Sequence, residues 1–255
     1  MLVDELVRGV LRRAEEAGLE LELLDYCAGI RYCYAIISGG RGRTAMGVAY
    51  VPAPEVSHGA LPEQAEPWDA LELVTSTNLL EKALGVAIVN AISQVLLDLS
   101  GVKTGDILEH LRLKGDDKVV LVGHIRPLYE ALKRAGLQVT VVERDPSLRG
   151  PDVLPDTMLL RALEGATVCL ATGSCLVNDT VDIVAHFARA CRVRALVGPT
   201  AQALPKLLHA AGFTHVASIH VTDTRAAAVA LRRGGGTREL LRYSIKYVAC
   251  RGSNS

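Results

Sequence analysis

Two hydrophobic patterns follow each other along the first part of the chain. Over residues 2–17, apolar side chains recur every three or four positions with charged side chains between them, which predicts an amphipathic helix that ends at Gly18. Residues 20–38 and 44–51 alternate instead and contain several tyrosines, which indicates an antiparallel meander. Residues 52–68 hold four prolines and therefore predict a loop.

The most apolar stretch predicts a long helix over about residues 79–99. Asn78 and Glu81 have the spacing of a capping box at its start. Apolar side chains surround most of this helix, so we expect it to lie buried between two layers or two domains. Asn90, in its middle, then needs a hydrogen-bond partner, either a backbone carbonyl or a group in an interdomain cleft, because an unpaired buried amide costs about 1–3 kcal/mol.

From residue 117 onward, short apolar runs alternate with helical patterns, which is typical of a doubly wound parallel sheet. The expected parallel strands are 118–123, 137–143, 167–172, 194–198 and 215–221, and a last helix is expected over 237–249. The sequence thus predicts an α/β fold. A small α+β part, residues 1–110, precedes a Rossmann-like part, residues 111–255.

Three short loops follow strands of the predicted sheet and contain glycine with polar residues. Because parallel strands end at one edge of a sheet, we expect these loops to form one ligand site. Glycines there leave room for a ligand, and helix starts offer unpaired N–H groups that favour an anion. The predicted ligand-binding residues are Asn90, Gly123, His124, Pro127, Glu143, Gly173, Ser174, Asn178, Thr180, Gly198, Pro199 and Thr200.

Each of these features also has a purely structural interpretation. Asn178 and Thr180 are ordinary helix caps, and Glu143 can be a solvated carboxylate beside an arginine. Glu143 nevertheless follows Gly123 at about the distance at which dinucleotide-binding folds place the acid that holds a ribose. The full Gly-x-Gly-x-x-Gly motif is missing, so a nucleotide- or adenosyl-cofactor-dependent enzyme is the alternative hypothesis.

The composition narrows the classes of partner. The 255 residues carry 28 basic and 28 acidic side chains, and this balance argues against a protein that coats nucleic acid. The amino terminus lacks the pattern of a signal peptide, and polar residues interrupt the apolar segment 79–97. We therefore expect a cytoplasmic protein without a nucleic-acid or membrane partner. A structural homodimer whose sheet-edge loops merely pack is a further alternative.

Six cysteines are present, and none forms a Cys-x-x-Cys pair, so a structural zinc site is not indicated. Cys175 differs from the others because it lies in a polar loop at the edge of the predicted pocket. His124 and Cys175 are candidate ligands of a transition or heavy metal ion, the one cofactor that the residues suggest. A lone histidine at a strand end is, however, more often a hydrogen-bonded structural group.

Several short segments, in order, resemble the family described as "putative heavy-metal chelation". They are Leu84-Gly85-Val86-Ala87-Ile88-Val89-Asn90-Ala91, Leu121-Val122-Gly123-His124 with Pro127, Glu143, Thr172-Gly173-Ser174 with Asn178-Asp179-Thr180, and Gly198-Pro199-Thr200 with Pro205. The resemblance implies a small domain like the amino-terminal domain of enolase, then a Rossmann-like domain, with a cleft between them. It also implies binding or chelation of a heavy metal. With the anion-favouring loops, the expectation is a heavy-metal-chelating or small anionic-ligand-binding protein whose site lies in the interdomain cleft, with catalytic residues unknown.

Overall fold

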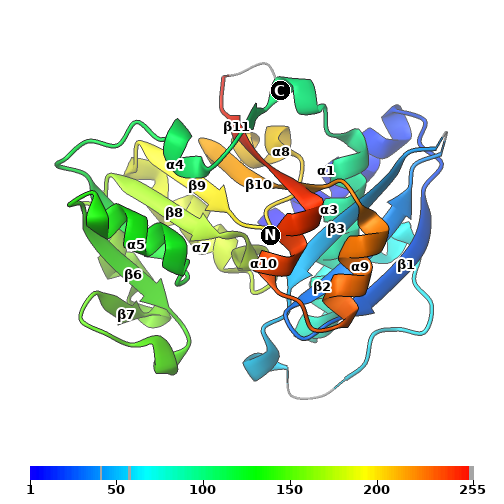
Figure 1. The fold of residues 1–255 in the computed structure, drawn as a ribbon, viewed down its shortest axis with the longest axis horizontal. Coiled ribbons are helices and arrows are strands. Elements are labelled where there is room, and N and C mark those ends of the chain that lie inside the picture. Colours follow the sequence, from blue (N-terminus) through cyan, green and yellow to red (C-terminus); the bar gives the residue numbers. More distant parts are fainter. Residues whose placement is uncertain (41, 57–58, 253–255) are drawn as a thin grey trace.

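The structure is a computed structural model that describes residues 1–40, 42–56 and 59–252 (Figure 1). Its amino-terminal part is a three-stranded antiparallel sheet in the order β1-β2-β3, covered by helices. The elements are α1 (Leu2–Glu16), β1 (Glu22–Ala28), β2 (Tyr32–Ser38), β3 (Thr44–Tyr50), α2 (Ala70–Thr75) and α3 (Leu79–Leu96). The predicted first helix and the meander are confirmed, and Gly18 ends the helix with a φ of +61°.

The second part is an eight-stranded, mostly parallel sheet in the order β4-β11-β10-β9-β8-β5-β6-β7. Its strands are β4 (Lys103–Thr104), β5 (Lys118–Val122), β6 (Gln138–Glu143), β7 (Val153–Pro155), β8 (Val168–Thr172), β9 (Val193–Val197), β10 (His215–Val221) and β11 (Ser244–Cys250). The main helices are α4 (Ile107–His110), α5 (Arg126–Arg134), α6 (Leu159–Leu163), α7 (Thr180–Phe187), α8 (Pro205–Ala210), α9 (Thr224–Arg232) and α10 (Thr237–Leu240). All five predicted parallel strands are confirmed, and so is the α/β fold class.

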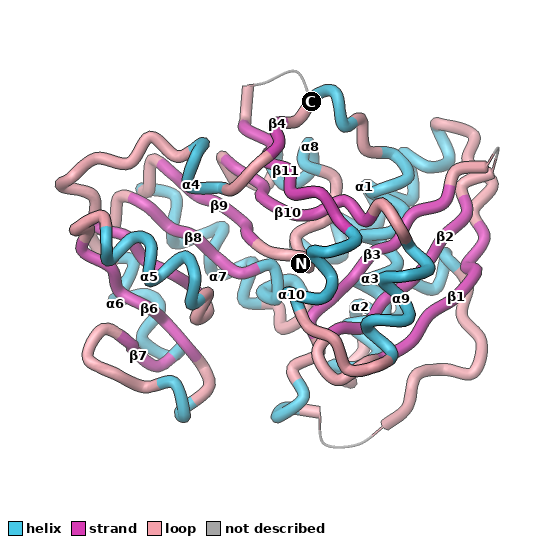
Figure 2. Tube along the Cα trace, viewed as in Figure 1, coloured by secondary structure: helices cyan, strands magenta, loops and turns pink. Residues whose placement is uncertain are grey.

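Two local predictions are wrong. The helix expected over 237–249 is a short helix, α10, followed by strand β11, which pairs antiparallel with β10 (Figure 2). Ile245, Tyr247 and Val248 are typical strand formers, and pairing with β10 buries Tyr247, Val248 and Ala249, so a strand replaces the second half of the expected helix. The capping box is absent as well: Asn78 caps α3 through its side chain, but Glu81 accepts a hydrogen bond from Ser76 instead.

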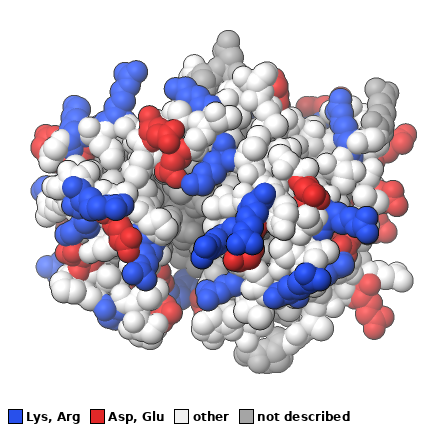
Figure 3. All heavy atoms as spheres, viewed as in Figure 1, with Lys and Arg blue, Asp and Glu red and all other residues white. Residues whose placement is uncertain are grey.

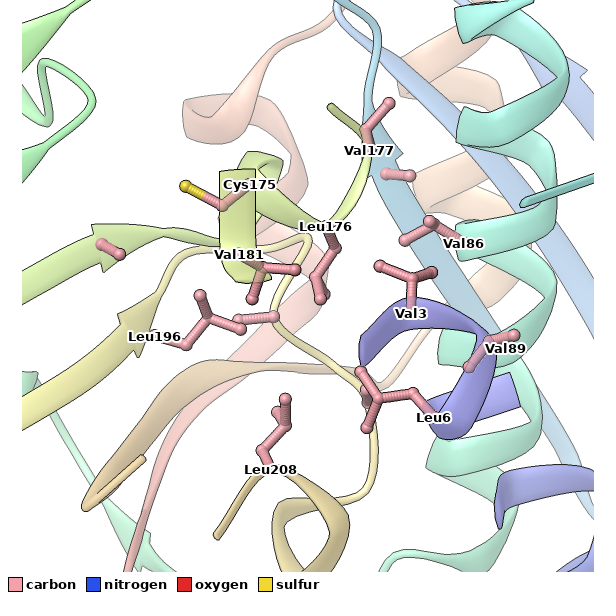
Figure 4. Packing of buried hydrophobic residues seen from close by; sticks show 14 of the residues in the cluster. Val3, Leu6, Val86, Val89, Cys175, Leu176, Val177, Val181, Leu196 and Leu208 are labelled. Atoms are coloured by element: carbon pink, nitrogen blue, oxygen red, sulfur yellow. The ribbon is translucent and has the colours of Figure 1, made fainter. Parts of the chain in front are cut away.

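Helix α3 packs on the small sheet and on the second part of the chain. It is long and apolar enough to cross a membrane, yet 78% of that stretch is buried, as in the core helix of a soluble α/β protein. Figure 4 shows Val86 and Val89 of α3 beside Val3 and Leu6 of α1. Together with residues of β8, β9 and α7 they form one buried hydrophobic cluster. The two parts therefore share a core, and a domain boundary at residue 110 stays a prediction.

Candidate functional site

The loops at the carboxyl ends of β5, β6, β8 and β9 open into one cleft with a volume of about 1500 Å³. Figure 3 shows the groove between the two halves of this face. The small part contributes a wall that includes Tyr32, Tyr50 and Glu55. The predicted residues that line the cleft are Gly123, His124, Pro127, Glu143, Gly173, Ser174, Cys175, Asn178, Thr180, Gly198, Pro199 and Thr200. The structure thus brings the predicted loops together, while their role in ligand binding stays a prediction.

Asn90 is the predicted residue that does not line the cleft. Its side chain is completely buried, and its Nδ2 atom donates to the carbonyl oxygens of Val48 and Thr200, at 2.8 Å each. The expected hydrogen bond is therefore present, although Oδ1 has no partner among the described residues. Of the two roles considered from the sequence, the geometry favours the structural one, in which Asn90 joins β3 to the loop after β9.

Strand β3 is an edge strand whose outward backbone groups are satisfied by side chains. Gln202 Oε1 accepts from the amide of Val48 at 2.8 Å, and its Nε2 donates to the carbonyl of Met46 at 3.2 Å and to that of Ile219 at 3.1 Å. Thr200 Oγ1 accepts from the amide of Tyr50 at 2.9 Å. A buried backbone group needs a partner, so the 198–204 loop closes this edge and fixes the small sheet against the large one.

The glycines of the cleft have different roles. Gly198 has a φ of +111° and open space where a Cβ would lie, so an added side chain would enter the cleft. At Gly173, a Cβ would lie 2.5 Å from the backbone nitrogen of Ala201. At Gly123, with a φ of +91°, it would lie 2.5 Å from the side chain of Thr172. Gly173 therefore makes room for a neighbouring backbone, while its predicted role in ligand binding stays a prediction.

The Glu143 carboxylate binds three backbone amides. Oε2 accepts from His124 at 2.7 Å, and Oε1 accepts from Arg144 at 2.6 Å and from Asp145 at 3.0 Å. It is therefore not the solvated carboxylate of the structural interpretation. Glu143 thereby connects the loop after β5 to the turn after β6. Most of the hydrogen-bond acceptor capacity of its carboxylate is used inside the protein. Few acceptor positions remain on this carboxylate for the ribose hydroxyls of a bound nucleotide, as the nucleotide hypothesis requires.

The helix starts at the cleft also use many of their own N–H groups. The amides of Leu128 and Tyr129 both donate to the carbonyl of Ile125, at 3.0 Å each, in the first turn of α5. The amide of Thr180, the first residue of α7, donates to Asn178 Oδ1 at 3.3 Å, although the N-cap residue is Asp179. Binding of an anion in this cleft therefore depends more on cationic and hydroxyl side chains, and less on helix N–H groups, than the sequence suggested.

The turn that carries Asn178 is held by a partly buried ion pair. Asp179 adopts the left-handed conformation with a φ of +59°, which is unusual for a residue with a side chain. Its carboxylate pairs with Lys82 of α3, whose side chain is 11% exposed. This contact fastens the loop after β8 to the core helix of the small part.

His124 and Cys175 follow the neighbouring strands β5 and β8, as expected. The ring of His124 lies against that of Tyr129, with 5.7 Å between their centres. Burial raises the pKa of the Cys175 thiol to about 11, so the thiol is protonated at neutral pH. The described residues contain no group of three or more His, Cys, Asp and Glu side chains that could hold a metal ion. A metal site made of protein ligands alone therefore lacks support in this part of the chain.

Sequence reasoning missed the cationic residues that line the cleft. Arg144, directly after β6, forms ion pairs with Glu55 and with Asp156. Lys246 pairs with Asp106 at 2.9 Å. Arg31 also lines the cleft, and its guanidinium has no carboxylate partner within the described ranges. These residues come from segments without a recognisable motif: Arg31 precedes β2, Arg144 follows β6, and Lys246 lies within β11.

Comparison with known proteins identifies relatives along the whole chain. Two family models, both described as "putative heavy-metal chelation", match residues 11–93 and 106–250. An uncharacterised protein of Methanocaldococcus jannaschii is 30% identical over 254 residues, which cover 97% of each chain.

Two crystal structures of proteins of unknown function from the DUF364 family have the same fold. The protein of Pyrococcus horikoshii is 31% identical, with a TM-score of 0.87 over 97% of this chain and 99% of its own. The protein of Desulfitobacterium hafniense is 19% identical, with a TM-score of 0.74 over 96% of this chain and 99% of its own. The second likeness bears on the fold alone.

Proposed function

Because the chain belongs to the family described as "putative heavy-metal chelation", we propose that its cleft binds a small anionic ligand, alone or as the chelator of a heavy or transition metal ion. The observation that carries this proposal is the meeting of the loops after β5, β8 and β9 in one cleft between the two parts of the chain. Such a position at the carboxyl edge of a parallel sheet is where α/β proteins bind small molecules.

Basic and acidic side chains both line the cleft, so the support for an anion comes from individual cations and not from an excess of positive charge. Arg31, Arg144 and Lys246 line it, and Arg31 has no competing carboxylate among the described residues. The hydroxyl groups of Ser174 and Thr180 lie at the same edge of the sheet. Guanidinium and hydroxyl groups together are suited to carboxylate or phosphate oxygens.

A metal ion would enter this cleft as a chelate. Zinc and similar ions need about four ligands, and His124 with Cys175 offers two at most. An organic anion would supply the missing donor atoms. An organic chelator would thus explain how a member of a chelation family can bind a metal ion although its described residues contain no cluster of metal ligands.

The nucleotide- or adenosyl-cofactor-dependent enzyme is the weaker hypothesis. The carboxylate of Glu143 is taken up by backbone amides, and the glycine pattern of dinucleotide sites is missing. A cytoplasmic location and a homodimer stay predictions from the sequence.

Isothermal titration calorimetry of the full chain, prepared without chelators, tests the proposal. The probes are phosphate, citrate, zinc citrate and Zn²⁺ alone. We expect citrate or zinc citrate to bind, and Zn²⁺ alone to bind at least about tenfold more weakly, a difference of roughly 1.4 kcal/mol.

The variant Arg31→Gln should weaken anion binding by about fivefold, because an exposed cation contributes about 1 kcal/mol to such a contact. Arg12→Gln, on the exposed face of α1, is the matched control and should bind like the wild type. Tight binding of Zn²⁺ alone, or no binding of any anion, would contradict the proposal.

A further inference from the structure

Arg144 and Glu55 connect the two walls of the cleft. Arg144 follows β6 in the large sheet, whereas Glu55 ends the 3-10 helix η1 (Ala53–Glu55) that follows the small sheet. Both side chains line the cleft and form an ion pair across it. We propose that Arg144 is an anion-binding residue of the cleft, and that Glu55 is a built-in competitor that occupies it in the absence of ligand. This inference rests on the proposed function.

The surroundings of Arg144 fit an anion site. Its Nε donates to Asp156 Oδ2 at 2.9 Å and its Nη1 donates to Glu55, so two internal carboxylates already bind the guanidinium in the way an external anion would. The guanidinium carries five N–H donors, so others remain for a ligand. The amide of Arg144 is fixed by Glu143 at 2.6 Å, which holds the residue at the end of β6.

The charge of Arg144 also reaches the predicted ligand loops. Burial is the main influence on the pKa of the Cys175 thiol and raises it, whereas the positive charge of Arg144 opposes this rise. The guanidinium therefore acts on the loop after β8 as well as on its own turn. An anionic ligand held between the loops after β6 and β8 would therefore be attracted by the positive charge of Arg144.

The other cations of the cleft lack this arrangement. Lys246 pairs with Asp106, and both lie in the region of the large sheet and its short helix α4. Arg126 pairs with Glu130, one turn further along the same helix. Arg144 is the cleft cation whose ion pair joins the two parts of the chain within the described residues, so its release can be linked to ligand entry.

The energetics allow Glu55 to be displaced. The side chains of Arg144 and Glu55 are 37% and 33% exposed, and ion pairs accessible to water are worth only about 0–1 kcal/mol. A ligand carboxylate or phosphate that also contacts other groups of the cleft can therefore take the place of Glu55. Removing the competing carboxylate should then strengthen anion binding, and removing Arg144 should weaken it.

The test is a double-mutant cycle with citrate as the probe, measured by calorimetry on the full chain. We expect Glu55→Gln to increase citrate affinity about threefold to fivefold and Arg144→Gln to decrease it about tenfold. In the Arg144→Gln background, Glu55→Gln should change citrate affinity little, because the guanidinium for which Glu55 and citrate compete is then absent. Arg144→Lys, which keeps the charge but loses the planar fork, should bind with intermediate affinity.

Asp145→Asn is the matched control. Asp145 lines the same cleft, but its carboxylate caps the amide of Ser147 at 2.9 Å, and no ion pair with Arg144 involves it. An equal gain of affinity in Asp145→Asn and Glu55→Gln, or an unchanged gain when Arg144 is absent, would overturn the inference. If the wild type bound citrate while the cycle showed no coupling between Glu55 and Arg144, the inferred competition would be wrong but the proposed function would stand. If no anionic probe bound the wild type, the proposed function itself would fail.

Discussion

Replacing Gly173 by alanine is expected to lower the free energy of unfolding by about 1–3 kcal/mol. An added Cβ would lie 2.5 Å from the amide nitrogen of Ala201 and 2.8 Å from the carbonyl carbon of Thr200. Rotation of a side chain cannot relieve contacts with backbone atoms, so the loop after β9 must move. Chemical denaturation should show the loss as a lower midpoint with an unchanged slope.

Gly115→Ala is the control for this substitution. Nothing lies within 4 Å of a Cβ at Gly115, and its backbone is not left-handed, so alanine should leave stability nearly unchanged. A Gly173→Ala protein that was as stable as this control but bound citrate poorly would show the opposite role. The glycine would then make room for the ligand, as the sequence had suggested.

Replacing Gln202 by leucine should have the larger effect, a loss of about 3 kcal/mol or more. The side chain is completely buried, and its removal leaves the amide of Val48 and the carbonyls of Met46 and Ile219 without their partner. Each buried polar group that loses its partner costs about 1–3 kcal/mol. Thermal unfolding measures the loss, and amide hydrogen exchange should accelerate at Val48.

Gln138→Leu, at the exposed start of β6, is the comparison for Gln202→Leu. It makes the same chemical change without touching the edge of β3. Equal stabilities of the two variants, with unchanged exchange at Val48, would show that the closed edge contributes little to the fold.

The architecture could be predicted because its signals are local. Each parallel strand is a continuous apolar run between helical patterns, so the pattern alone indicates strands such as 118–123 and 167–172. The gathering of the loops after them follows from the topology of parallel strands, which all end on one side. Residues such as Ser174 and Asn178 could therefore be placed at the cleft from the sequence.

The remaining features depend on contacts between distant residues. Strand β11 lies beside β10 and contains the strand formers Ile245, Tyr247 and Val248, but the helical start of the segment at α10 hid the change from helix to strand. Gln202 meets Val48, which is 154 residues away, and Arg144 meets Glu55, which is 89 residues away. No local pattern marks such pairs. The close approach at Gly173 could not be predicted for the same reason, since the nearest backbone atom belongs to Ala201.

Native mass spectrometry with elemental analysis tests the central claim most directly. The full chain is incubated with zinc citrate and freed of excess reagent, and the mass of the intact protein is then measured. If the cleft binds anionic chelates, the mass should increase by citrate or by zinc and citrate together, and Arg31→Gln with Arg144→Gln should abolish the increase. An adduct of zinc without citrate, retained in that double variant, would contradict the account and place the metal on protein ligands elsewhere.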